Sequence, residues 1–281
     1  MNKIINYPSI GNDIVVNKKE LKKAVLSREN NRKTIKIAIL GGSTTAEIKN
    51  ILELYLLDSG IEPIFYESDY NQYYLDIISE KKELIEFSPD VIYVHTTFVN
   101  IEEFPSLNDS IETVETILNR EYKRFEYFWQ KINALFNCVI IQNNFELPQY
   151  RSLGNLDTCL PQGKTNYIQR LNLLFSNASQ ETDNLYIQDI NYLASNMGLD
   201  NWWDSTFYYS YKYALSFSAI PFLAHNFTKM VCAIYGLSKK VLVVDLDNTL
   251  WGGIVGEDGL SGLSIGGDYP GNEFIIGSGE N

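Results

Sequence analysis

The sequence contains few of the residues that stabilise small secreted domains or bind metal ions through sulfur. It has three cysteines in 281 residues, Cys138, Cys159 and Cys232, and they form no CxxC pair. An odd number of widely spaced cysteines argues against a disulfide framework and against a structural zinc site. This cysteine usage is typical of a reducing compartment, so we expect a cytoplasmic protein.

Long hydrophobic runs and an excess of basic residues are also missing. No stretch of 18 apolar residues occurs, so we expect no membrane-spanning helix. The net charge is −12, and nucleic acid is not an expected partner because phosphate backbones are bound by clustered Lys and Arg. Basic residues do gather near the N-terminus, at Lys18, Lys19, Lys22, Lys23, Arg28, Arg32, Lys33 and Lys36. They form either a docking patch for an acidic partner or the solvated face of a helix.

Short β-branched runs alternate with helical patterns along most of the chain, which predicts βαβ units and a parallel sheet. Strands are expected at residues 35–40, 63–67, 91–95, 139–142, 185–188 and 241–245. Helices are expected at residues 18–28, 46–57, 71–85, 112–135, 165–178 and 216–235. The predicted fold class is α/β, a three-layer α/β/α sandwich with a mostly parallel sheet.

The most informative motif follows the last expected strand. Asp245 and Asp247 stand two residues apart, directly after the apolar run at 241–244. In an open α/β sheet, ligands bind at the carboxyl ends of the strands. At such a position Asp245 can attack phosphorus and Asp247 can transfer the proton. The alternative is that two surface aspartates cap a turn.

The run Asp-Leu-Asp-Asn-Thr at 245–249 resembles motif I, DxDxT, of the haloacid dehalogenase (HAD) superfamily. Its continuation to Gly259 is similar to the FkbH-like branch, HAD subfamily IIIC. The resemblance implies that Asp245 is the nucleophile and a Mg²⁺ ligand. It also implies that Asp247 is the general acid/base and a second Mg²⁺ ligand, and that Thr249 positions the motif against the substrate.

The same resemblance implies a cytoplasmic enzyme that dephosphorylates a small phosphoglyceryl-type donor. The enzyme then loads glyceryl onto the phosphopantetheine arm of an acyl carrier protein. The later motifs of that family do not follow, and residues 277–281 read like a linker or tag. We therefore expect this chain by itself to show no phosphatase activity and to hold no tightly bound metal ion. A non-catalytic module that binds the carrier protein or its pantetheine arm is the alternative.

A second motif follows the first expected strand, 35–40. There Gly42, Ser43 and Thr44 lead directly into a helix. Ser43 would stand at the carboxyl end of the strand, either as the helix N-cap or as a nucleophile. Serine and threonine are common N-cap residues, so the local sequence favours the N-cap role for Ser43.

This arrangement resembles block I of the SGNH/GDSL hydrolases, a flavodoxin-like fold, with Gly42 in place of the usual Asp. Asn100 lies near the position of the Asn in the GxND block of that family. The best match to the final DxxH block is Asp204 to Phe207, with Phe in place of the catalytic His. The chain has only two histidines, His95 and His225, and neither lies in this block. Because Ser43 then lacks the expected base, a domain without hydrolytic activity is expected. A Ser43-dependent esterase or acyltransferase is the alternative.

Neutral polar residues stand at the ends of other expected strands, at Thr96, Thr97, Gln142, Asn143 and Asn144. They either contact a sugar-like, phosphate or pantetheine ligand or cap loops. The aromatic residues of 202–213 form either a recognition surface or core packing. The predicted substrate-binding residues are Gly42, Thr44, Asn100, Asn143 and Thr249.

The patterns predict four segments. An N-terminal helical segment, 1–32, precedes an SGNH-like domain at 33–236. A polar connector then leads to the start of a HAD-like domain at 237–276, and the linker-like residues 277–281 close the chain.

Overall fold

The computed structural model describes Ile5 and residues 11–28, 31–238, 243, 245–249, 251–259 and 262. The chain divides into two compact units, Met1–Cys232 and Ala233–Asn281. Among the described residues, no helix has the length and apolar character needed to span a bilayer.

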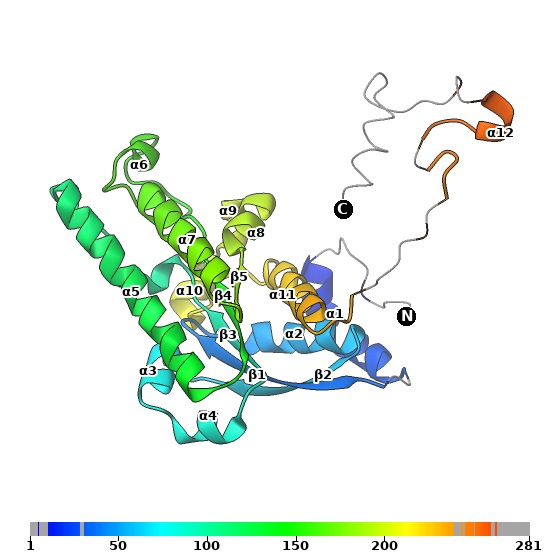
Figure 1. Cartoon of the computed structure of the whole chain (residues 1–281), viewed down its shortest axis with the longest axis horizontal. Coiled ribbons are helices and arrows are strands. Elements are labelled where there is room, and N and C mark those ends of the chain that lie inside the picture. Colours follow the sequence, from blue (N-terminus) through cyan, green and yellow to red (C-terminus); the bar gives the residue numbers. More distant parts are fainter. Residues whose placement is uncertain are drawn as a thin grey trace. The chain divides into compact units, whose positions relative to one another are not determined.

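A five-stranded, all-parallel sheet forms the centre of the first unit (Figure 1). Its strands are β1 (Lys33–Gly41), β2 (Ile61–Glu67), β3 (Val91–His95), β4 (Val139–Asn143) and β5 (Leu185–Gln188). The strand order β2-β1-β3-β4-β5 is the flavodoxin-like order and confirms the predicted fold class. The order reverses between β1 and β3, and this is the switch point at which such sheets bind ligands.

Helices cover both faces of the sheet (Figure 1). They are α1 (Gly11–Leu26), α2 (Ala46–Asp58), α3 (Tyr73–Ile78), α4 (Lys82–Phe87), α5 (Ile111–Leu135), α6 (Leu156–Cys159), α7 (Lys164–Glu181), α8 (Ile190–Met197), α9 (Leu199–Trp202), α10 (Ser205–Tyr211) and α11 (Ile220–Ile234), with the 3-10 helix η1 (Phe98–Asn100). Residues of α3, α4, α5 and α7 share one core cluster with the sheet, including Phe125 and Phe175. On the opposite face, Phe227 of α11 lies 4.5 Å from the ring of Tyr93.

The strands form where the sequence is apolar on both faces. All five residues of β3 are buried, as are the last five of β1, because helices cover both sides of a parallel sheet. Strand β2 begins two residues before its predicted start. Its Pro63 lacks a backbone N–H, but β2 is an edge strand, where proline is tolerated.

Three predicted helices differ from the structure. The helix expected at 18–28 is α1, which begins at Gly11 and ends at Leu26. The single helix expected at 71–85 is divided into α3 and α4, because Glu80 adopts a left-handed conformation with φ of 54°. The helix expected from residue 216 begins at Ile220. Ser216 accepts the N–H of Ala219 through its hydroxyl, and Pro221 fits the first turn of the helix.

The second unit contains the short helix α12 (Val255–Asp258) and an isolated bridge between Asp247 and Trp251. The strand expected at 241–245 falls largely outside the described residues, and the two of its residues that are described, Val243 and Asp245, belong to no strand. Residues 277–281 also lie outside the described part of the chain.

Candidate functional site

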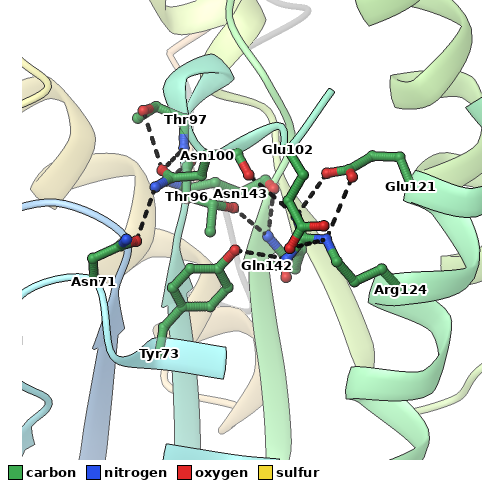
Figure 2. Close-up of polar contacts among 10 residues, drawn as sticks. All are labelled: Asn71, Tyr73, Thr96, Thr97, Asn100, Glu102, Glu121, Arg124, Gln142 and Asn143. Atoms are coloured by element: carbon green, nitrogen blue, oxygen red, sulfur yellow. Dashed lines mark hydrogen bonds and ion pairs between the residues drawn. The ribbon is translucent and has the colours of Figure 1, made fainter. Parts of the chain in front are cut away.

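Gly42 and Asn100 meet at the switch point between β1 and β3. Figure 2 shows Asn100 beside Thr97 and Asn71. The Asn100 amide nitrogen donates to the Gly42 carbonyl at 2.8 Å, and its amide oxygen accepts the Thr97 N–H at 3.0 Å. The Gly42 N–H donates to the His95 carbonyl on β3 at 2.9 Å. A Cβ on Gly42 would stand 2.4 Å from the Asn100 amide nitrogen. The turn therefore accepts only glycine here while Asn100 keeps both bonds.

Ser43 is buried, with 3% of its surface exposed, and its hydroxyl has no hydrogen-bond partner among the described residues. The expectation that Ser43 caps the helix is wrong. The N-cap of α2 is Thr45, two residues further along, because the turn continues before the helix starts. Thr44 is held at this turn, where its hydroxyl donates to the Tyr211 carbonyl at 2.7 Å.

His95 cannot serve as a base for Ser43. Its Nδ1 lies 3.0 Å from the amide nitrogen of Asn143, which can only donate, and 3.1 Å from the Tyr93 hydroxyl, so we assign Nδ1 as the acceptor and the ring proton to Nε2. Burial lowers the pKa of the His95 imidazole to about 3. The remaining lone pair is thus already used by Asn143, and no nitrogen of His95 bonds the Ser43 hydroxyl.

The other candidates for a base also lie elsewhere. The ring of His225 packs 5.7 Å from Tyr55, the tenth residue of α2 and about 14 Å along the helix from its start. Phe207, which replaces the family histidine, stacks on Phe217 with ring centroids 4.3 Å apart. Asp204 accepts the N–H of Phe207 and so caps α10. This geometry does not support the Ser43-dependent esterase.

We expect Ser43→Ala to change the free energy of unfolding by less than about 0.5 kcal/mol, because the hydroxyl makes no bond that would be lost. If Ser43 were the N-cap, its replacement would instead lower the free energy of unfolding by about 1 kcal/mol. Urea unfolding of the wild type and of Ser43→Ala measures this change in the free energy of unfolding. A fluorophosphonate probe should leave wild-type Ser43 unlabelled, and covalent labelling of that residue would contradict the assignment.

The neutral polar residues at the strand ends are buried, and three of them, Thr96, Gln142 and Asn143, bond to one another (Figure 2). Gln142 donates to the Thr96 hydroxyl at 2.8 Å and accepts the indole N–H of Trp129 at 3.1 Å. Asn143 donates to the Thr96 carbonyl at 3.2 Å as well as to His95. These residues therefore fix the carboxyl ends of β3 and β4. Asn143, predicted to bind substrate, is part of this buried network.

Arg124 on α5 also reaches the switch point, although no motif in the sequence indicated it (Figure 2). Its guanidinium donates to the Glu121 carboxylate at 2.6 Å, to the Tyr73 hydroxyl at 2.9 Å and to the Asn100 carbonyl at 3.1 Å. Only 10% of the Arg124 side chain and 4% of the Glu121 side chain are exposed. Arg124, Tyr73 and Asn100 line a cavity of about 360 Å³. The Arg124–Glu121 ion pair thus anchors the loop that contains Asn100, whose side chain bonds Gly42.

A larger cavity of about 510 Å³ lies where Phe98 of η1 meets the loop after β4 and the residues that lead into α10. Glu146, in the same loop after β4, is 1% exposed, and its carboxyl oxygens have no well-aligned partner among the described residues. Burial raises the pKa of the Glu146 carboxyl to about 8, and donors from the Phe98 backbone and the Trp202 indole offset only part of this effect. The carboxyl is therefore largely protonated at neutral pH.

The raised pKa of Glu146 predicts a fall in stability as the pH rises. Between the unfolded pKa of 4.5 and the folded pKa of about 8, the folded state binds a proton that the unfolded state has lost. The free energy of unfolding therefore decreases through this window, by up to about 1.4 kcal/mol per pH unit. Buried His95 acts in the opposite direction, but only between its folded pKa of about 3 and its unfolded pKa of 6.5.

Urea unfolding of the wild type and of Glu146→Gln between pH 6.5 and 8 isolates the effect of Glu146, because the titration of unfolded His95 near pH 6.5 contributes equally to both proteins. Glu146→Gln should flatten the pH dependence in this interval. The matched control is Glu83→Gln, which changes an exposed acid on α4 and should leave the slope as in the wild type. Equal slopes in the wild type and Glu146→Gln would contradict the assignment.

The residues of the DxDxT motif lie in the second unit. Asp245 is exposed, and Asp247 accepts the Trp251 indole N–H at 3.0 Å and the Val255 N–H at 3.2 Å through one oxygen. The N–H of Thr249 closes a turn on the Leu246 carbonyl at 3.3 Å. Two carboxylates are hard oxygen ligands of the type that Mg²⁺ prefers. The described residues contain no group of three or more His, Cys, Asp or Glu that could hold a metal ion.

Four of the basic residues near the N-terminus, Lys18, Lys22, Arg28 and Arg32, pair with acids, whereas Lys19 and Lys23 are exposed. Lys18 and Lys22 of α1 pair with Glu47 and Glu53 of α2. Arg28 lies 3.2 Å from the buried carboxylate of Asp58. These pairs attach α1 to α2 and neutralise much of the cluster.

Comparison with known proteins gives one family. The family described as FkbH, N-terminal domain, matches residues 36–232. A solved structure of the N-terminal part of a Bacteroides fragilis protein, which contains a phosphatase domain and is complexed with Mg, has a TM-score of 0.77 at 23% identity. This match covers 94% of the chain and 69% of the Bacteroides fragilis chain, and it establishes a shared fold.

Two other solved structures are less similar. The structure of TesA has a TM-score of 0.47 at 11% identity, covering 73% of this chain and 100% of that chain. A GDSL-like lipase from Bacteroides thetaiotaomicron has a TM-score of 0.41 at 8% identity, covering 78% of this chain and 99% of that chain. No curated protein matches the sequence.

Proposed function

The chain belongs to the FkbH N-terminal domain family, and from this premise we propose that it is part of an FkbH-like enzyme of the HAD type. The enzyme removes phosphate from a phosphoglyceryl-type donor and loads glyceryl onto an acyl carrier protein. The observation that carries the proposal is the DxDxT motif at 245–249, which follows the family match at 36–232 by only a short connector.

In this proposal the Asp245 carboxylate bonds to phosphorus, and the bond between phosphorus and the glyceryl oxygen breaks. Asp247 donates a proton to that leaving oxygen and afterwards accepts one from the water that releases phosphate. The bonds from Trp251 and Val255 fix one oxygen of Asp247 and so orient its carboxyl group. Mg²⁺, which Asp245 and Asp247 would hold, supplies charge neutralisation at the phosphate.

Loading is a separate step on a donor whose carboxyl group is activated as an acyl phosphate. The pantetheine sulfur bonds to the carbonyl carbon, and the bond from that carbon to the leaving phosphate oxygen breaks.

The test uses full-length protein with Mg²⁺, a phosphoglyceryl donor and an acyl carrier protein that bears its phosphopantetheine arm. We expect phosphate release together with an increase in the intact mass of the carrier that corresponds to one glyceryl group. Phosphate release without a change in the carrier's mass would contradict loading. An unchanged carrier and no released phosphate would contradict the whole proposal.

A different role is proposed for the first unit. Its Ser43 has no base among the described residues, which removes the support for hydrolysis there. Cavities nevertheless border η1 next to the switch point. The first unit therefore acts as a binding domain.

A further inference from the structure

The cavity of about 510 Å³ stands at the edge of the sheet where this fold binds ligands. Phe98 follows β3, Tyr150 lies in the loop that follows β4, and Trp203 precedes α10, so three separate segments form the walls. Its volume is within the range of small-molecule sites, about 300–1,000 Å³. All of these segments belong to the first unit, and none contains a residue of the DxDxT motif.

Four of the eight residues that line the cavity are aromatic. The rings of Phe98 and Trp203 lie 5.6 Å apart, and Trp203 packs 4.6 Å from Tyr208, which supports it from behind. Tyr150 and Tyr209 stand at the rim and are 78% and 73% exposed. Large tyrosines left in water beside a cavity are typical of binding surfaces, because each offers a flat apolar face and a hydroxyl group.

The charges around the cavity disfavour anions. Its lining contains no lysine, arginine or histidine among the described residues, and its one ionisable acid is Asp204. One oxygen of Asp204 accepts N–H groups of α10, which keeps the carboxylate in place. Gln149 adds a neutral amide, oriented by its bond to Asp200 at 2.9 Å. A phosphate or carboxylate would meet a negative charge with no cation to balance it.

We propose that this cavity binds a neutral ligand that has an apolar face and hydroxyl or amide groups. The rings of Trp203, Tyr150 and Tyr209 cover the apolar face, while Asp204 and Gln149 accept or donate hydrogen bonds at its edge. A sugar and an amide-linked chain such as pantetheine share this chemistry. The inference is independent of the phosphatase chemistry proposed for Asp245, because binding requires no turnover.

Calorimetry on the full chain tests the proposal with four probes. N-acetylglucosamine and pantetheine represent the two neutral sources, and acetate and glucuronate, which are neither donor nor product of the phosphatase chemistry proposed for Asp245, represent anions. We expect at least one neutral probe to bind and both anions to bind more weakly or not at all. The absence of binding by both neutral probes, or tighter binding of either anion, would overturn the proposal.

The double variant Tyr150→Ala/Tyr209→Ala removes the rim. Because both side chains are largely exposed, the protein should remain folded, and binding of the neutral probe should weaken by about tenfold or more. Tyr192→Ala is the matched control, since Tyr192 is a 65% exposed tyrosine on α8 outside the cavity. Unchanged affinity in the double variant, or an equal loss in Tyr192→Ala, would contradict binding in this cavity.

Discussion

Replacing Asp245 with asparagine is expected to reduce phosphate release by the full-length enzyme by about 10³-fold or more. The asparagine amide has nearly the shape of the carboxylate, but it carries no negative charge and is a poor nucleophile. Asp245 is exposed and makes only a local bond, in which its own carboxylate accepts the N–H of Leu246 at 2.9 Å. The substitution should therefore remove chemistry without unfolding the protein. Phosphate release and circular dichroism, measured on the same preparation, separate these two effects.

Asp183→Asn is the matched control for Asp245→Asn. Asp183 is an exposed aspartate in the loop before β5, so the same chemical change there should leave the rate within about twofold of the wild type. Retention of a tenth or more of the activity in Asp245→Asn would contradict the role of Asp245 as nucleophile. Because neutral-ligand binding is measured without turnover, it should be the same in both variants.

Arg124→Met is expected to lower the free energy of unfolding by about 3–5 kcal/mol, because it leaves Glu121 as an unpaired charge in a buried position. Methionine keeps the apolar part of the side chain but removes the bonds to Tyr73 and to the Asn100 carbonyl. The substitution therefore also loosens the segment that holds Gly42. Urea unfolding measures the loss, and adding Glu121→Leu should recover part of it by removing the stranded charge.

Lys123→Met provides the control on the same helix. Lys123 pairs with Glu126 at the same three-residue spacing, but these side chains are 56% and 30% exposed. Exposed pairs of this kind contribute little, so the expected change is about 0.5 kcal/mol or less. Similar losses in Arg124→Met and Lys123→Met would show that the Arg124 pair is no more than a surface contact.

These two ion pairs illustrate what the sequence could not provide. Arg124 with Glu121 and Lys123 with Glu126 have the same spacing on α5, so both satisfy the same local rule. Only the packing of α5 against α3 and η1 buries the first pair and leaves the second in water. The periodicity of 112–135 predicted the helix, but it carried no information about the groups that the helix would meet.

Ser43 was misjudged for a related reason. The sequence placed it correctly after a buried strand and next to a helix, yet its N-cap role depended on where the first helical turn began. That start was decided by contacts distant in sequence, including the bonds of Thr44 to Tyr211 and of Asn100 to Gly42. The sequence offered the aromatic residues of 202–213 as either a recognition surface or core packing, but it indicated neither Glu146 nor the cavity that this segment forms with Phe98 and Tyr150. Burial and neighbours arise from segments that meet only in the folded chain.

The sequence by itself determined the order of strands and helices in the first unit, because runs that are apolar on both faces form parallel strands and amphipathic runs form the helices that cover them. It also supplied the DxDxT motif at 245–249, a signal that depends on neighbouring residues alone. The tertiary structure decided which polar groups are buried, which charges are paired, that no described residue bonds Ser43 as a base, and where a cavity opens at the sheet edge. These properties depend on desolvation and on contacts between distant segments, and local patterns do not encode either of them.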